Sequence, residues 1–122
     1  MAHVLVIDDN PEICSILQEA LEDAGYDVIV AGNGRAGVER YLEGGVDLVI
    51  TDIFMPEQDG IETILELRRA NPDVKIIAMS GGGSVRDFTY LPAARQLGAV
   101  HSMAKPFDVH EVLATVRQLL SG

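Results

Sequence analysis

The chain alternates between short apolar runs and longer segments in which apolar residues recur every three or four positions. Such a run is typical of a buried strand, whereas the wider spacing is typical of an amphipathic helix. The runs predict five strands, at residues 4–7, 28–30, 46–52, 74–79 and 100–103. The third has the unbroken apolar centre Leu48, Val49 and Ile50. This pattern indicates burial on both faces and a central place in a parallel sheet.

Capping and turn-forming residues set the limits of the helices. Asn10 and Pro11 are an N-cap and first-turn pair, and Gly25 is a typical C-terminal stop. Cys14 lies beside the apolar stripe of this helix, and we interpret it as a packing residue. The stripe consists of Ile13, Ile16, Leu17, Ala20, Leu21 and Ala24. Leu42 and Leu65 mark the second and third helices, a fourth is expected between residues 86 and 97, and Asp108 caps the last.

Strand and helix therefore alternate five times along the chain. Such alternation predicts an α/β fold with a doubly wound parallel sheet and helices on both faces. The length of 122 residues fits a single domain, residues 1–122. We expect no output domain, so that any downstream protein effector would be contacted in trans. The second strand ends without residues of chemical interest, which suggests that it forms an edge of the sheet.

Four of the predicted strands end on polar residues. Asp8 and Asp9 follow the first strand, Asp52 ends the third, and Ser80 and Lys105 follow the fourth and fifth. Parallel strands end on one edge of a sheet, which is where ligands bind in open α/β folds. Three carboxylates repel one another, and oxygen ligands favour a hard cation such as Mg²⁺. Asp52 is then a plausible nucleophile towards a phosphoryl group, whose oxygens Ser80 and Lys105 could contact.

Composition narrows the choice of partners. The formal net charge of −10 opposes direct binding to nucleic acid or to an anionic membrane surface. The single cysteine excludes an internal disulfide and is compatible with a reducing compartment. The sequence shows no signal peptide and no apolar run of membrane-spanning length. We therefore expect a cytoplasmic location and no membrane partner.

The chain resembles the response-regulator receiver domain of two-component signalling. The matching segments are VLVIDDNPEI, DLVITDIFMPEQDG, IIAMSGG, LGA and AKPF. The resemblance implies a flavodoxin-like (βα)5 fold with strand order 2-1-3-4-5. It also implies that Asp52 accepts a phosphoryl group from a histidine kinase or a histidine phosphotransfer protein. Phosphorylation would then change the surface formed by the fourth helix, the fifth strand and the fifth helix.

The same resemblance assigns roles to individual residues. Asp9, Asp52 and the backbone carbonyl of Phe54 would bind Mg²⁺ directly, and Asp8 would act mostly through a bound water. Ser80 and Lys105 would contact the phosphoryl oxygens. The domain would not be an enzyme acting on separate substrates, although it would take part in its own phosphotransfer and autodephosphorylation.

Three features depart from the family pattern. Ser102 stands where the family has a switch aromatic, and a serine has no large ring to swing between the surface and the interior. The stretch from Ser80 to Lys105 is longer than usual and opens with three glycines, which predicts a mobile loop. Phe54 and Gly82 occupy positions that tune dephosphorylation in the family. The ring of Phe54 would shield the phosphoryl group from water, whereas Gly82 would leave the approach of water open.

Three other functions remain open from the sequence. A haloacid-dehalogenase-like phosphatase also uses an aspartate nucleophile with Mg²⁺, but it needs a second aspartate where Phe54 stands. A flavodoxin-like cofactor binder needs a phosphate loop of small residues, where this chain has Asp8 and Asp9. The third is an adaptor receiver that is never phosphorylated, and the intact acidic residues argue against it.

Overall fold

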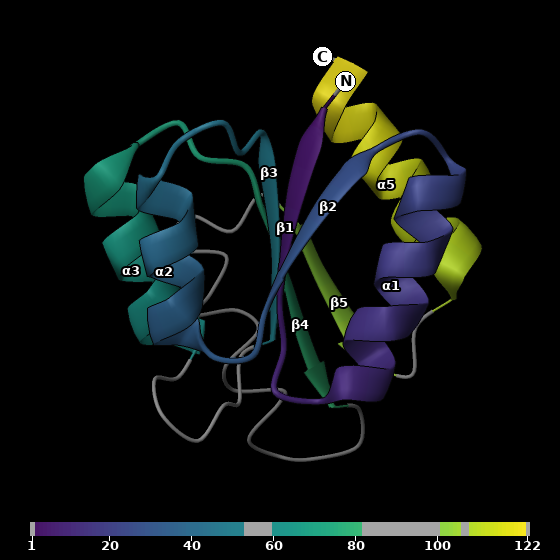
Figure 1. The fold of residues 1–122 in the computed structure, drawn as a ribbon, viewed down its shortest axis with the longest axis horizontal. Helices are drawn as coiled ribbons and strands as arrows, with labels where there is room; N and C mark the ends of the chain where they lie inside the picture. Colours follow the sequence, from purple (N-terminus) through teal and green to yellow (C-terminus); the bar gives the residue numbers. More distant parts are fainter. Residues whose placement is uncertain (1, 53–59, 82–100, 106–107, 122) are drawn as a thin grey trace.

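The computed structural model describes residues 2–52, 60–81, 101–105 and 108–121. Its core is a five-stranded sheet with helices packed on both faces (Figure 1). The strands are β1 (His3–Ile7), β2 (Asp27–Ala31), β3 (Leu48–Asp52), β4 (Ile76–Gly81) and β5 (His101–Lys105). The helices are α1 (Pro11–Asp23), α2 (Gly34–Leu42), α3 (Gly60–Ala70) and α5 (Val109–Ser121). The helix expected between residues 86 and 97 and the loop after Ser80 lie outside these ranges.

The sheet confirms the expected topology. Its strand order is β2-β1-β3-β4-β5, and every neighbouring pair is parallel. β2 is therefore an edge strand, as its ending suggested, and β3 lies in the middle. All five residues of β3 are buried, which explains its unbroken apolar sequence. Because the strands are parallel, their carboxyl ends lie together at one edge of the sheet, which is the lower edge in Figure 1.

Each face of the sheet has its own hydrophobic cluster. Leu5 and Ile7 of β1 point to the side covered by α2 and α3, whereas Val4 and Val6 point to the side covered by α1 and α5 (Figure 1). This alternation is the two-residue period of a strand buried on both faces. Full burial of an aliphatic side chain stabilises the fold by roughly 1.5–3 kcal/mol.

Side-chain caps begin the first two helices. The Asn10 carboxamide oxygen accepts hydrogen bonds from the backbone N–H of Glu12 at 2.9 Å and of Ile13 at 3.5 Å. Asn33 does the same for Ala36 at 2.8 Å. The chain leaves α1 through Gly25 with φ of 98°, a conformation that favours glycine. These caps confirm the helix limits predicted from the sequence.

Gly37 in α2 permits a close approach to the sheet. A Cβ at this position would overlap the side chain of Ile7 in β1. The helix can pack at this depth only because residue 37 has no side chain. The contact holds α2 against the strand that leads into Asp8 and Asp9.

Some apolar residues lie differently from the prediction. Ile16, expected in the buried stripe of α1, is 47% exposed, and Leu42 and Leu65 are exposed as well. Cys14, expected beside the stripe, is buried with Leu17 and Leu21. The buried face of α1 is therefore formed by Cys14, Leu17 and Leu21, and it is rotated away from Ile16 relative to the predicted stripe. Val74, predicted to begin the fourth strand, belongs to a turn, since its N–H donates to the carbonyl of Asn71 at 3.1 Å.

Among the residues that the structure describes, no helix has the length and apolar character needed to cross a membrane.

Candidate functional site at the carboxyl edge of the sheet

The sheet brings together the three acidic residues singled out in the sequence. Asp52 is the last residue of β3, and Asp8 directly follows β1. Ile7 pairs with Thr51 in the register of these strands, so Asp8 and Asp52 occupy neighbouring positions one step further on. Carboxylate oxygens of Asp8, Asp9 and Asp52 lie within 4.8 Å of one another. The expected convergence of acids from the first and third strands is confirmed.

The two strand-end acids are deeply buried, whereas the third faces solvent. Asp8 is 1% exposed and Asp52 is 5% exposed, while Asp9 is classed with the exposed residues. Buried carboxylates need polar partners to offset the loss of hydration. Asp8 Oδ1 accepts a hydrogen bond from the Asn10 backbone N–H at 2.9 Å. This local turn lets β1 pass directly into the cap of α1.

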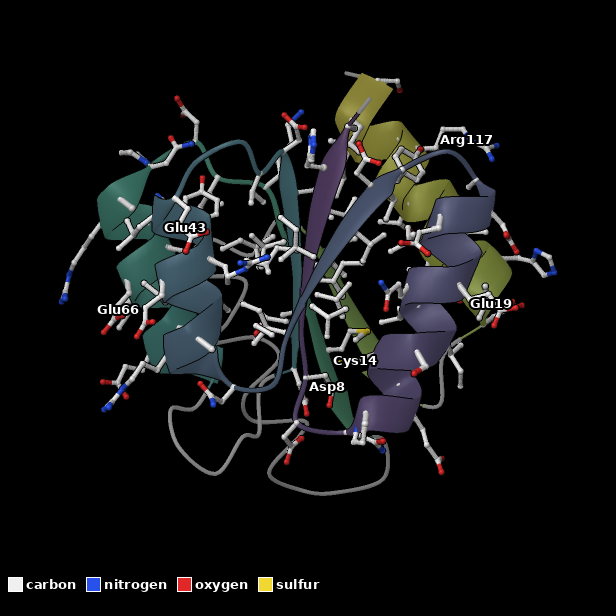
Figure 2. All side chains as sticks on the ribbon, viewed as in Figure 1. Asp8, Cys14, Glu19, Glu43, Glu66 and Arg117 are labelled. Carbon is white, nitrogen blue, oxygen red and sulfur yellow. The ribbon has the colours of Figure 1, made fainter. Side chains whose placement is uncertain are left out.

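Side-chain donors also hold the backbone at both acids. The Cys14 thiol donates to the carbonyl oxygen of Asp8, with 3.3 Å between sulfur and oxygen. The Thr51 hydroxyl donates to the carbonyl oxygen of Asp52 at 3.0 Å. Figure 2 shows the Cys14 sulfur between α1 and the sheet, close to the end of β1 at Asp8. Each acid therefore has its main chain fixed by a neighbouring buried side chain.

The spacing of the acidic cluster suits a hard cation that keeps part of its water shell. Mg²⁺ binds oxygen at about 2.0–2.1 Å, so two oxygens on opposite sides of one ion are roughly 4.2 Å apart. The spread of up to 4.8 Å in the cluster is slightly larger. It fits direct bonds from one or two carboxylates, with a water bridging to the third. The described donor set contains only oxygens, which matches Mg²⁺ rather than a softer metal.

The backbone of β4 and β5 extends to the same edge. Asp52 pairs with Met79, so Ser80 lies one residue beyond the level of Asp52. Lys105 pairs with Gly81, one residue further again. The register therefore places the main chain of both predicted phosphoryl-contacting residues at the edge that carries the acids. Phe54, the predicted source of a carbonyl ligand, lies outside the described residues.

A surface pocket of about 360 Å³ adjoins the acids on the side of the edge strand. Asp8 and Asp9 contribute one part of its wall. The remaining wall comes from α1 and the end of β2, namely Pro11, Cys14, Ser15, Gln18, Val30 and Gly32. The pocket therefore opens beside Asp8 and Asp9, although Asp8 itself is almost fully buried.

Sequence reasoning missed the two donors that hold the acid backbones. The sequence pattern indicates only packing for Cys14 and gives Thr51 no distinct role. The signal for Cys14 was its position three and seven residues before Leu17 and Leu21, which places all three on one side of a helix. For Thr51 the only signal was a hydroxyl within an otherwise apolar strand.

A parallel sheet of order β2-β1-β3-β4-β5 with three acids at its carboxyl edge is the arrangement expected of a flavodoxin-like receiver. Comparison with known proteins agrees. The family model described as the response regulator receiver domain matches residues 4–117. The chain therefore belongs to the response regulator receiver domain family. This membership supports a phosphoacceptor receiver over the phosphatase and cofactor-binding alternatives, and the intact acidic cluster argues against the adaptor.

Curated relatives are longer than this chain. It is 32% identical over 118 residues to the uncharacterized transcriptional regulatory protein YkoG of Bacillus subtilis, covering 97% of this chain and 50% of that protein. It is 36% identical over 118 residues to the transcriptional regulatory protein ZraR of Escherichia coli, covering 97% of this chain and 26% of that protein. The chain thus spans half or less of the length of these relatives, whose names describe regulators rather than enzymes.

Solved structures share the fold over nearly the whole chain. A response regulator receiver domain protein from Clostridium thermocellum has a TM-score of 0.91 at 27% identity, covering 99% of this chain and 95% of its own. The response regulator TrrA from Thermotoga maritima, solved in complex with Mg²⁺ and BeF, has a TM-score of 0.86 at 33% identity. That match covers 98% of this chain and all of TrrA.

Proposed function

We propose that Asp52 of this receiver takes a phosphoryl group from a phosphohistidine in a two-component or phosphorelay system, with Mg²⁺ bound by the adjacent acids. The observation that carries the proposal is the meeting of Asp8, Asp9 and Asp52 within 4.8 Å at the carboxyl edge. The donor would be a histidine kinase or a histidine phosphotransfer protein. The reaction forms a bond between an Asp52 carboxylate oxygen and phosphorus. It breaks the bond between phosphorus and the histidine nitrogen, which leaves with the electron pair.

Each residue has one role in this proposal. Asp9, Asp52 and the Phe54 carbonyl would hold Mg²⁺, with Asp8 acting through a water molecule. The ion would neutralise charge on the phosphoryl oxygens, which is most of what phosphoryl transfer asks of a protein. Ser80 and Lys105 would contact those oxygens, and the position of their backbones at the same edge supports this. The Mg²⁺ and BeF complex of the related TrrA supports the choice of metal.

Phosphorylation would act by shifting a population of conformations. It adds negative charge beside Asp8 and Asp9, and the segments after β4 and before α5 would adjust to it. A downstream protein effector that prefers the altered surface of the fourth predicted helix, β5 and α5 would receive the signal. Loss of the phosphoryl group to water would reset the domain. The domain as a single unit, its cytoplasmic location, its action in trans and its lack of direct contact with nucleic acid all remain predictions.

The test is incubation with a small phosphodonor, such as acetyl phosphate, followed by intact-mass measurement. The wild-type chain is expected to gain one phosphoryl group in the presence of Mg²⁺ and none with a chelator. Asp52→Asn is expected to lose the label completely. Asp47→Asn is the matched control, because Asp47 precedes the same strand at its opposite end, and it is expected to label normally.

Two outcomes would contradict the proposal. Labelling that survives Asp52→Asn would place the acceptor elsewhere in the chain. Multiple turnover of a phosphomonoester without accumulation of labelled protein would instead favour a phosphatase.

A further inference from the structure

The thiol of Cys14 contacts the peptide group that joins the two acids after β1. Its sulfur lies 3.3 Å from the carbonyl oxygen of Asp8, and the residue is only 6% exposed. That carbonyl belongs to the peptide between Asp8 and Asp9. Rotation of this peptide would move the backbone from which the Asp9 carboxylate extends. The thiol is therefore in a position to set where Asp9 lies relative to Asp8 and Asp52.

Two further hydrogen bonds hold other groups of Asp8. Its backbone N–H donates to the carbonyl of Ala31 at 3.1 Å, which continues the pairing of β1 with β2. Its Oδ1 accepts from the Asn10 N–H at 2.9 Å. The Cys14 thiol contacts a third group of Asp8, its carbonyl oxygen. This contact comes from the first turns of α1 rather than from the sheet.

We propose that Cys14 is a positioning residue for the Asp8–Asp9 pair. Its thiol holds the connecting peptide so that the carboxylates keep the spacing that a hard cation needs. This inference rests on the proposed Mg²⁺ binding by the cluster. Residues that orient metal ligands affect metal affinity without touching the metal. A thiol is a weak donor, so we expect its removal to weaken Mg²⁺ binding by about two- to fivefold.

Three variants separate the donor from its packing role. Cys14→Val fills a similar volume and has no donor, whereas Cys14→Ser keeps a donor and loses some apolar volume. Leu17→Val is the matched packing control, because Leu17 lies on the same helix and in the same buried cluster as Cys14. Mg²⁺ affinity is measured by calorimetry, and unfolding by urea gives the stability of each variant.

A second readout needs no metal. The carbonyl ¹³C chemical shift of Asp8 reports the hydrogen bond that this oxygen accepts. It is expected to move in Cys14→Val, to return most of the way in Cys14→Ser, and to stay unchanged in Leu17→Val. Mg²⁺ affinity is expected to follow the same order.

The positioning role is wrong if Cys14→Val binds Mg²⁺ as tightly as the wild type. It is equally wrong if Leu17→Val, at a similar loss of stability, weakens Mg²⁺ binding as much. A wild-type chain that fails to bind Mg²⁺ would instead contradict the proposed function. The Asp8 carbonyl shift distinguishes the two failures, since it tests the thiol contact in the absence of metal.

Discussion

The two edges of the sheet carry similar residues in opposite electrostatic arrangements. At the amino edge, His3 of β1 lies between an aspartate on each side. Its Nε2 is 3.4 Å from Asp27 Oδ2 and its Nδ1 is 3.9 Å from Asp47 Oδ2, and its backbone N–H donates to Asp47 at 2.8 Å. At the carboxyl edge, the same strands β1 and β3 lead into Asp8, Asp9 and Asp52, which are all of one charge.

Burial adds to the contrast. The three side chains at the amino edge are about half exposed, so water screens their interaction. At the carboxyl edge two of the three acids are almost fully buried. At the amino edge the imidazole of His3 and the two carboxylates are partners for one another and need no ligand. Carboxylates brought this close together repel one another, and a bound cation would relieve that repulsion. This difference indicates that the residues at the amino edge have a structural role, whereas those at the carboxyl edge form the functional site.

The largest expected effect is stabilisation of the protein by Mg²⁺. At a free Mg²⁺ concentration of 100 times the dissociation constant, binding should add about 2.7 kcal/mol to the free energy of unfolding. Asp9→Asn removes a charged ligand and should lose most of this gain at the same concentration. Asp27→Asn, at the other edge, should keep it. Urea unfolding with and without Mg²⁺ measures this gain in stability for each variant. An equal loss of the gain in Asp9→Asn and Asp27→Asn would contradict Mg²⁺ binding at the carboxyl edge alone.

An intermediate effect is expected on stability without metal, with opposite signs at the two edges. Asp52→Asn relieves repulsion within the acidic cluster and should raise the free energy of unfolding by roughly 1 kcal/mol. Asp47→Asn removes a charge facing His3 and should lower it by less than about 1 kcal/mol. Both are measured by urea unfolding in the presence of a chelator. If Asp52→Asn instead lowers the free energy of unfolding, repulsion within the acidic cluster does not destabilise the metal-free protein.

The smallest effect is expected for His3→Gln. Glutamine keeps a polar side chain but cannot become cationic, so the loss of stability should be below about 1 kcal/mol. The difference from the wild type should shrink as salt is added, because these side chains are exposed to screening ions. Mg²⁺ affinity should not change. A loss of metal affinity in this variant would mean that the edges are coupled.

Much of the fold was predictable because local signals agree with the global topology. The Asn10 cap, the Gly25 stop and the apolar run ending at Asp52 each indicate one structure and no strong competitor. Parallel strands then made the meeting of Asp8 and Asp52 a consequence of order alone. The strand order itself came from the family resemblance, since alternation of elements allows several arrangements.

The remaining features depended on packing that a linear pattern does not contain. α1 exposes Ile16 and buries Cys14 in the cluster that it shares with β1 and α5, and this orientation is decided by packing between elements. The pairing of His3 with Asp27 and Asp47 depends on strand register, which brings together residues far apart in sequence. A polar residue precedes each of three apolar runs, and a parallel sheet places all three at its amino edge, but the sequence does not show which of their side chains pair.

The most direct measurement is a Mg²⁺ titration of the wild-type chain, followed through its backbone amide chemical shifts. If the acidic cluster binds Mg²⁺, saturable shifts with a single dissociation constant are expected at residues 8, 9 and 52, and no comparable shifts at residues 3, 27 and 47. Shifts of similar size at both edges, or none that saturate at the carboxyl edge, would contradict it.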